Sequence, residues 1–148
     1  MPGRSIVGLI FVPVFGTLNL IAYLTQISLI PALLGSLSEP AAADAAYIFL
    51  KYTLQLLPGS VVAFFNNLAY AILGVPSMIF GWSFSTNQNR VLRISGWLLI
   101  LNGIACILGF IGTIFNLDFL SLGTILGGAI FWLSLFPMTY VFLRRDFE

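Results

Sequence analysis

Four long apolar stretches, interrupted by few charges, constrain this chain more than any other feature. They cover residues 6–27, 60–82, 94–115 and 119–143. An α-helix needs about 20 apolar residues to cross a hydrocarbon core about 30 Å thick, and each stretch is long enough. With 59% hydrophobic and only 7% charged residues, the chain is too apolar for a soluble domain. We therefore expect an all-α integral membrane protein, a single domain of four transmembrane helices in an antiparallel bundle.

The basic residues predict how these helices are oriented. Five of the six basic residues lie before the first stretch, between the second and third, or after the fourth, and they are Arg4, Arg90, Arg93, Arg144 and Arg145. Lys51 alone lies between the first and second. Because cytoplasmic loops carry an excess of Lys and Arg, we expect both termini in the cytoplasm, with the arginines as topology anchors. The net charge of +1 is too small to favour nucleic acid as a partner.

The segment 41–57, between the first two stretches, has the pattern of an amphipathic helix. At about 100° per residue Asp44, Lys51 and Gln55 share one narrow stripe. The other side carries Phe49, Leu50, Leu54 and Leu57, and Pro58-Gly59 ends the pattern. We expect a short helix on the outer membrane surface. The alternative is a fifth crossing, which would bury two charged side chains and move Arg90 and Arg93 outside.

Small and polar residues share one face of each long stretch when it is wound as a helix. In the third stretch this face comprises Asn102, Ala105, Cys106, Gly109, Gly112, Thr113 and Asn116. In the second stretch it comprises Ala63, Asn67, Tyr70, Gly74, Ser77 and Gly81. The first stretch has a looser face of Gly8, Asn19, Ala22, Tyr23 and Gln26. In the fourth, Gly123 and Gly127 form a GxxxG pattern. Membrane helices associate through close backbone approach and interhelical hydrogen bonds, so we interpret these faces as packing surfaces.

The amide side chains allow two interpretations. With alternating helices, the outer half of the bilayer should hold Asn19, Gln26, Asn66, Asn67 and Asn116, and Asn102 should lie nearer the middle. Hydrogen bonding between helices, contributing about 0.6 to 2 kcal/mol per bond, is the interpretation we favour. The other is a small polar pocket under the surface helix, able to hold a quinone ring, a lipid headgroup or another neutral ligand.

Residues with catalytic chemistry are scarce. The chain has no histidine, and its five acidic residues are scattered, so neither a metal site nor an enzyme is expected. No span contains the carboxylate, histidine or lysine that a proton-coupled transporter normally needs. Cys106, alone in the middle of the third stretch, fits a small core residue. We expect no cofactor bound through obvious ligands, while contact with lipid, quinone or pigment stays open.

Our leading hypothesis is a non-catalytic accessory or structural subunit of a larger membrane complex, with respiratory and photosynthetic assemblies as candidate hosts. Its partners would be membrane lipid and other membrane-protein subunits. The alternative is a homo-oligomeric channel or carrier for an uncharged solute, with the outer-half amides lining its path. A lipid- or quinone-binding membrane protein is a further alternative.

Overall fold

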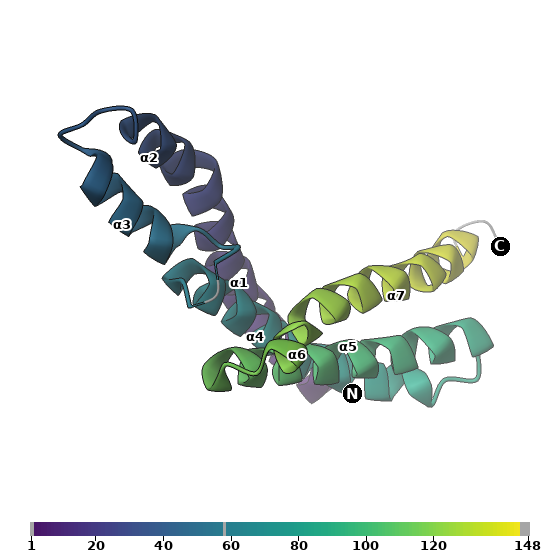
Figure 1. Ribbon diagram of the computed structural model, residues 1–148. Helices are drawn as coiled ribbons and strands as arrows, with labels where there is room; N and C mark the ends of the chain where they lie inside the picture. The colour runs from purple at the N-terminus through teal and green to yellow at the C-terminus, as the bar shows by residue number, and fades with distance from the viewer. Residues whose placement is uncertain (1, 58, 146–148) are drawn as a thin grey trace.

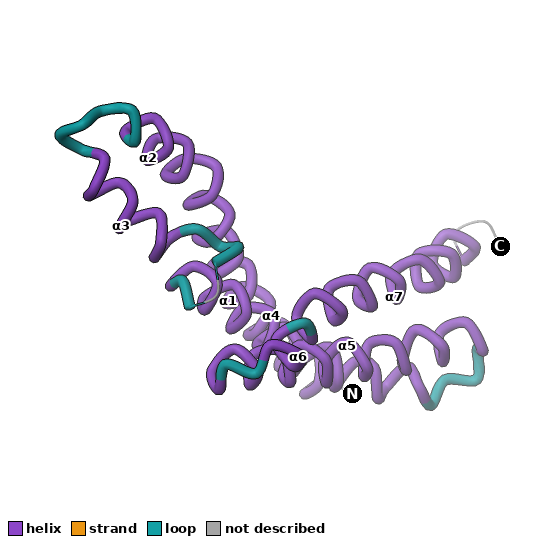
Figure 2. The backbone as a smooth tube through the Cα atoms, viewed as in Figure 1, coloured by secondary structure: helices purple, strands orange, loops and turns teal. Residues whose placement is uncertain are grey.

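The chain is helical, and four of its helices are long enough to cross a membrane. The computed structural model describes residues 2–57 and 59–145, and within these ranges it contains helices and no strand (Figures 1 and 2). By length and composition the four spanning candidates are residues Ile10–Ser36, Val61–Ser85, Arg90–Phe115 and Asp118–Arg144. This confirms the prediction of an all-helical, multi-pass membrane chain.

The first helix is longer than the sequence pattern predicted. The chain is helical from α1 (Pro2–Leu24) through a π-helical turn, η1 (Thr25–Leu29), into α2 (Ile30–Ser36). Pro31 has no N–H to donate and would crowd the carbonyl one turn earlier in a regular α-helix. The π turn just before it widens the helix, and the Ile30 N–H donates to the Thr25 carbonyl instead. The helix can therefore continue nine residues past the predicted end at residue 27.

The predicted surface segment contains a short helix, α3 (Ala43–Thr53), which runs back alongside α2 (Figure 1). Ala46 and Leu50 are buried, and the charged Asp44 and Lys51 are exposed. Eleven residues of α-helix are about 16 Å long, too short to cross the hydrocarbon core. The position of α3 at a membrane surface stays a prediction.

Two side-chain caps determine where the central helices begin. At α4 (Val61–Ser85) the Ser60 hydroxyl accepts a hydrogen bond from the Ala63 N–H at 3.0 Å. At α5 (Arg90–Phe115) Asn89 Oδ1 accepts from the Val91 N–H at 2.9 Å. These caps satisfy N–H groups that have no partner within the helix.

A tight turn follows α5. Asn116 adopts the left-handed conformation, with φ of 53°, and leads into the short α6 (Asp118–Ser121) and then α7 (Gly123–Arg145). Asparagine tolerates this conformation better than most residues. The fourth stretch is therefore interrupted near Leu122, where the sequence pattern predicted one continuous helix.

Glycines bring α4 and α5 into close backbone contact. Gly74 lies against Gly103, and Gly81 against Gly96. A Cβ atom placed on Gly74 would lie 2.9 Å from the Gly103 carbonyl oxygen, and one on Gly81 would lie 2.7 Å from the Gly96 oxygen. No real side chain tolerates such distances. The two helices can pack this closely only because both backbones are bare at these positions.

The other two long helices attach to this pair on different sides. Helix α7 packs on α5, where Gly109 meets Thr124, and the preceding α6 packs on α5 where Gly112 meets Ser121. Helix α1 packs on α4, where the rings of Phe15 and Tyr70 meet edge to face at 5.8 Å.

The described residues show no extended packing between α1 and α7. Figure 1 shows the α1–α2 rod and α7 diverging from the α4–α5 pair. The contacts thus join the long helices in the order α1, α4, α5, α7 without closing the ring. The antiparallel four-helix bundle stays a prediction.

Replacing Gly103 with alanine should destabilise the fold. The added methyl group would press on the Gly74 backbone and on Met78, and overpacking of this kind costs about 1–3 kcal/mol. Gly16 is the matched control, because nothing lies within 4 Å of a Cβ at that helical position. Gly16→Ala should be neutral or slightly stabilising, since alanine favours helix. Thermal unfolding in detergent measures both variants, and equal midpoints would contradict the close-contact account.

Candidate functional site

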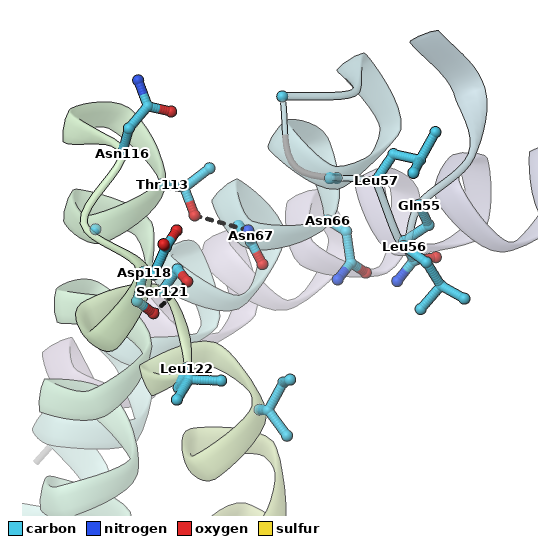
Figure 3. A pocket seen from close by; sticks show the side chains of 14 residues that line it. Gln55, Leu56, Leu57, Asn66, Asn67, Thr113, Asn116, Asp118, Ser121 and Leu122 are labelled. Atoms are coloured by element: carbon cyan, nitrogen blue, oxygen red, sulfur yellow. Dashed lines mark hydrogen bonds between the residues drawn. The ribbon is translucent and has the colours of Figure 1, made fainter. Parts of the chain in front are cut away.

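A polar hollow lies where α4 begins and α5 ends. It has a volume of about 360 Å³ and is bounded by the α3–α4 connection, α4, α5, α6 and the start of α7 (Figure 3). It is lined by Gln55, Leu56, Leu57, Gly59, Ala63, Asn66, Asn67, Gly112, Thr113, Asn116, Asp118, Ser121, Leu122 and Ile125. We call this hollow the amide pocket. Three of the predicted site residues, Asn66, Asn67 and Asn116, are thereby brought together.

Gln26 holds one wall of the amide pocket in place. Its Nε2 donates to the Thr53 carbonyl at 2.9 Å, and its Oε1 accepts from the Gln55 N–H at 3.1 Å. The Thr53 carbonyl lies in the last turn of α3 and has no partner within that helix, so the amide satisfies it. This link fixes the chain from Gln55 to Leu57 beside α4. Gln26 therefore supports the pocket without lining it.

A hydrogen bond between α4 and α5 forms the floor of the pocket. Asn67 Nδ2 donates to the Thr113 hydroxyl at 2.8 Å, and that hydroxyl donates to the Gly109 carbonyl at 3.0 Å (Figure 3). On the α6 side, the Ser121 hydroxyl donates to the backbone carbonyl of Asp118 at 2.7 Å. The hydroxyl groups of Thr113 and Ser121 therefore donate their protons to carbonyl groups of the protein. The Asp118 carboxylate and Asn67 Oδ1 remain as acceptors for a ligand.

The side-chain oxygen of Asn66, unlike the side chain of Asn67, is not hydrogen bonded within the described residues. Its side chain is only 8% exposed, and its Oδ1 has no hydrogen-bond partner among the described residues. Figure 3 shows Asn66 and Asn67 projecting from α4 into the same region. A buried acceptor without a partner costs about 1–3 kcal/mol. Within the amide pocket, such an atom is the group most suited to a ligand that donates a hydrogen bond.

The remaining predicted site residues lie elsewhere. Asn19 and Tyr70 meet between α1 and α4, where the Tyr70 hydroxyl interacts with the side chains of Tyr23 and Asn19. Asn102 is fully buried in α5, and its Oδ1 accepts from the Cys106 thiol at 3.2 Å.

The GxxxG glycines of α7 also lie outside the amide pocket. Gly123 faces Ala105 and Gly109 of α5, and Gly127 faces Cys106. The GxxxG pattern is therefore used within the chain.

The topology anchors lie away from the amide pocket. Arg90 and Arg93 are exposed at the opposite end of the α4–α5 pair, and the Arg144 guanidinium lies 4.7 Å from the centre of the Tyr140 ring. The side chains of Arg4 and Arg145 lie outside the described part of the structure.

Sequence reasoning missed Gln55, Thr113 and Asp118 as residues of one pocket. Gln55 was placed on the polar stripe of a surface helix. The tight turn after α5 was the available signal, because it returns Asp118 toward the start of α4.

A second hollow, the apolar groove, lies between α1 and α7 over the C-terminal half of α4. Its volume is about 280 Å³, and Ser77 is its only polar lining residue. It is lined by Val12, Leu73, Pro76, Ser77, Phe80, Phe84, Leu99, Phe131, Leu135 and Met138. The groove occupies the space where a closed bundle would bring α1 and α7 together.

Comparison with protein-family models, with curated proteins and with solved structures found no match for this chain. Its function is therefore inferred from its own residues. Those residues offer a neutral-to-acidic pocket at one end and an apolar groove nearer the other.

Neighbouring amides of the pocket should respond oppositely to replacement by leucine. Asn67→Leu removes the bond to Thr113 and should destabilise the fold by about 0.6 to 2 kcal/mol. Asn66→Leu removes an acceptor that has no partner, so stability should stay equal or rise. Thermal unfolding of the purified, delipidated protein measures both. An equal loss of stability in Asn66→Leu would show that Asn66 is hydrogen bonded.

Proposed function

We propose that this chain is a non-catalytic subunit of a larger membrane complex, held there by α1 and α7. The open arrangement of the helices is the observation that carries this proposal. In the first helix, only 6% of the most apolar 18-residue stretch is buried within the chain. The corresponding share is 17% in the last helix and 44% in α4. The two outer helices thus offer long apolar surfaces that the chain itself does not cover.

The proposed occupant of the apolar groove is a transmembrane helix of an unlike chain. Helices α1 and α7 each pack mainly on one long neighbour, so a further helix placed between them would complete the ring. The groove offers phenylalanine, leucine and methionine side chains, which are suited to van der Waals packing with another helix. The amides and glycines that could favour self-association are largely used in internal contacts.

A role through contacts rather than catalysis agrees with the residue inventory. The chain has no histidine, and of its acidic residues only Asp146 and Glu148 are close in sequence, while Glu39, Asp44 and Asp118 are distributed over separate segments. An enzyme would need a nucleophile with its base, a carboxylate pair or metal ligands in one place. The proposed activity is therefore structural.

The proposed topology places both termini, Arg90 and Arg93 in the cytoplasm. The four helices then cross in alternating directions as an antiparallel assembly, and α3 lies at the outer surface with Lys51 in water. The charge distribution supports this orientation. The amide pocket, at the far end of the α4–α5 pair from Arg90, then opens on the outer side.

The single lysine tests this topology. A membrane-impermeant amine reagent applied to intact cells should label Lys51, which is exposed on α3. In a Lys51→Arg background, a lysine in place of the exposed Gln88 should react only after lysis. Peptide mass spectrometry locates the label. Labelling of position 88 on intact cells, or no outer labelling of Lys51, would overturn the proposed orientation.

Photo-crosslinking tests the proposed partner. A photoreactive phenylalanine derivative in place of Val12, in the apolar groove, should capture an unlike membrane protein in native membranes. Ile21 is the matched control, because it is equally exposed (52% against 51%) and, nine residues along the helix, lies on the opposite side of α1. Capture of a second copy from position 12 would favour the channel or carrier alternative, and capture of lipid alone would contradict both.

A further inference from the structure

We propose that the amide pocket binds a primary ammonium group, of the kind that an ethanolamine lipid headgroup carries. This inference is independent of the partner proposed for the apolar groove. It starts from the unpartnered Oδ1 of Asn66, which is buried in a pocket large enough to admit a small polar group. Water or a ligand must supply a donor there if that oxygen is to be satisfied.

The charge of the pocket favours a cation. Its lining includes one carboxylate, Asp118, and no Lys or Arg. The side chains of Asn66 and Asn67 from α4 and of Asp118 from α6 also line it, and each carries an acceptor oxygen (Figure 3). An ammonium group carries N–H donors and a positive charge, and hydrogen bonds to an ionised partner are about twice as strong as neutral ones. An anion would meet a carboxylate with no cation to offset it.

The same lining discriminates between kinds of ammonium. A quaternary choline group has no N–H and is usually recognised by aromatic faces. The amide pocket has no Phe, Tyr or Trp in its lining. It instead offers hydrogen-bond acceptors, which only a primary or partly substituted ammonium can use.

A lipid would also fit the surroundings of the pocket. Leu122 and Ile125 on its α7 side are 50% and 71% exposed, and Leu56 on the other side is 87% exposed. Acyl chains could lie on these side chains, while the Gln55 and Asn116 amides provide N–H donors for a phosphate. A free amine would use the same acceptors without the apolar contacts.

Native mass spectrometry of the full chain in detergent tests the proposal. Dioleoyl phosphatidylethanolamine should be retained about ten-fold better than dioleoyl phosphatidylcholine, which has the same acyl chains. Asp118→Asn and Asn66→Leu should each reduce that preference several-fold. Asp44→Asn is the matched control, because Asp44 is also exposed on the proposed outer side and does not line the pocket. It should leave the preference unchanged.

Free ethanolamine separates the two sources of the ammonium group. If millimolar ethanolamine displaces the lipid, the ammonium group alone is recognised; if it does not, the acyl chains contribute, and either result supports the site. Equal retention of the two lipids, or an unchanged preference in both pocket variants, would overturn the proposal. Because Asn66→Leu should keep its thermal stability, a lost preference in that variant cannot be attributed to unfolding.

Discussion

Close backbone contact between α4 and α5 is the constraint on which the rest of this structure depends. In a membrane, apolar side chains gain little free energy by moving from lipid into a helix contact. Helices therefore associate where their backbones can approach closely and polar groups can pair. The glycine pairs Gly74–Gly103 and Gly81–Gly96 satisfy the first condition, and the Asn67–Thr113 hydrogen bond satisfies the second. Both outer helices are attached to this pair, and each contacts mainly one of its members.

Features that depend on local sequence properties could be predicted, whereas features that depend on the geometry of a particular turn could not. Apolar length and helical periodicity are local properties, and they predicted four spanning helices and the faces that carry Asn67, Gly74 and Gly109. The extension of the first helix to Ser36 depends on a π turn ahead of Pro31, which no periodicity reveals. The interruption at Leu122 was missed for the same reason, since it depends on the geometry of the turn at Asn116.

The amide pocket could be predicted only as a set of residue types. The alternating direction of the helices placed most amides toward one side of the bilayer, and helical winding placed Asn67 but not Asn66 on the packing face, but neither argument identifies a hydrogen-bond partner. Asn66 and Asn67 are adjacent in sequence and chemically identical, yet only Asn67 has a partner across the helix contact. That difference arises from the register of α4 against α5, which the glycine contacts determine. The partners of Gln26 could not be predicted from the sequence either, because they are backbone groups 27 and 29 residues away.

The two hollows are consequences of the same packing. Helix α7 is held to α5 by Gly109, Gly123 and Gly127, all in the half of the contact nearer α6, and beyond them Phe131 and Leu135 are too bulky for equally close contact. Helix α7 therefore diverges toward its C-terminus, which opens the apolar groove against α1 (Figure 1). At the other end of the α4–α5 pair, where α4 begins, the short α6 and the chain linked by Gln26 enclose the amide pocket. Polar and apolar binding surfaces are thus separated along one helix pair, with the buried Asn102 and Cys106 between them.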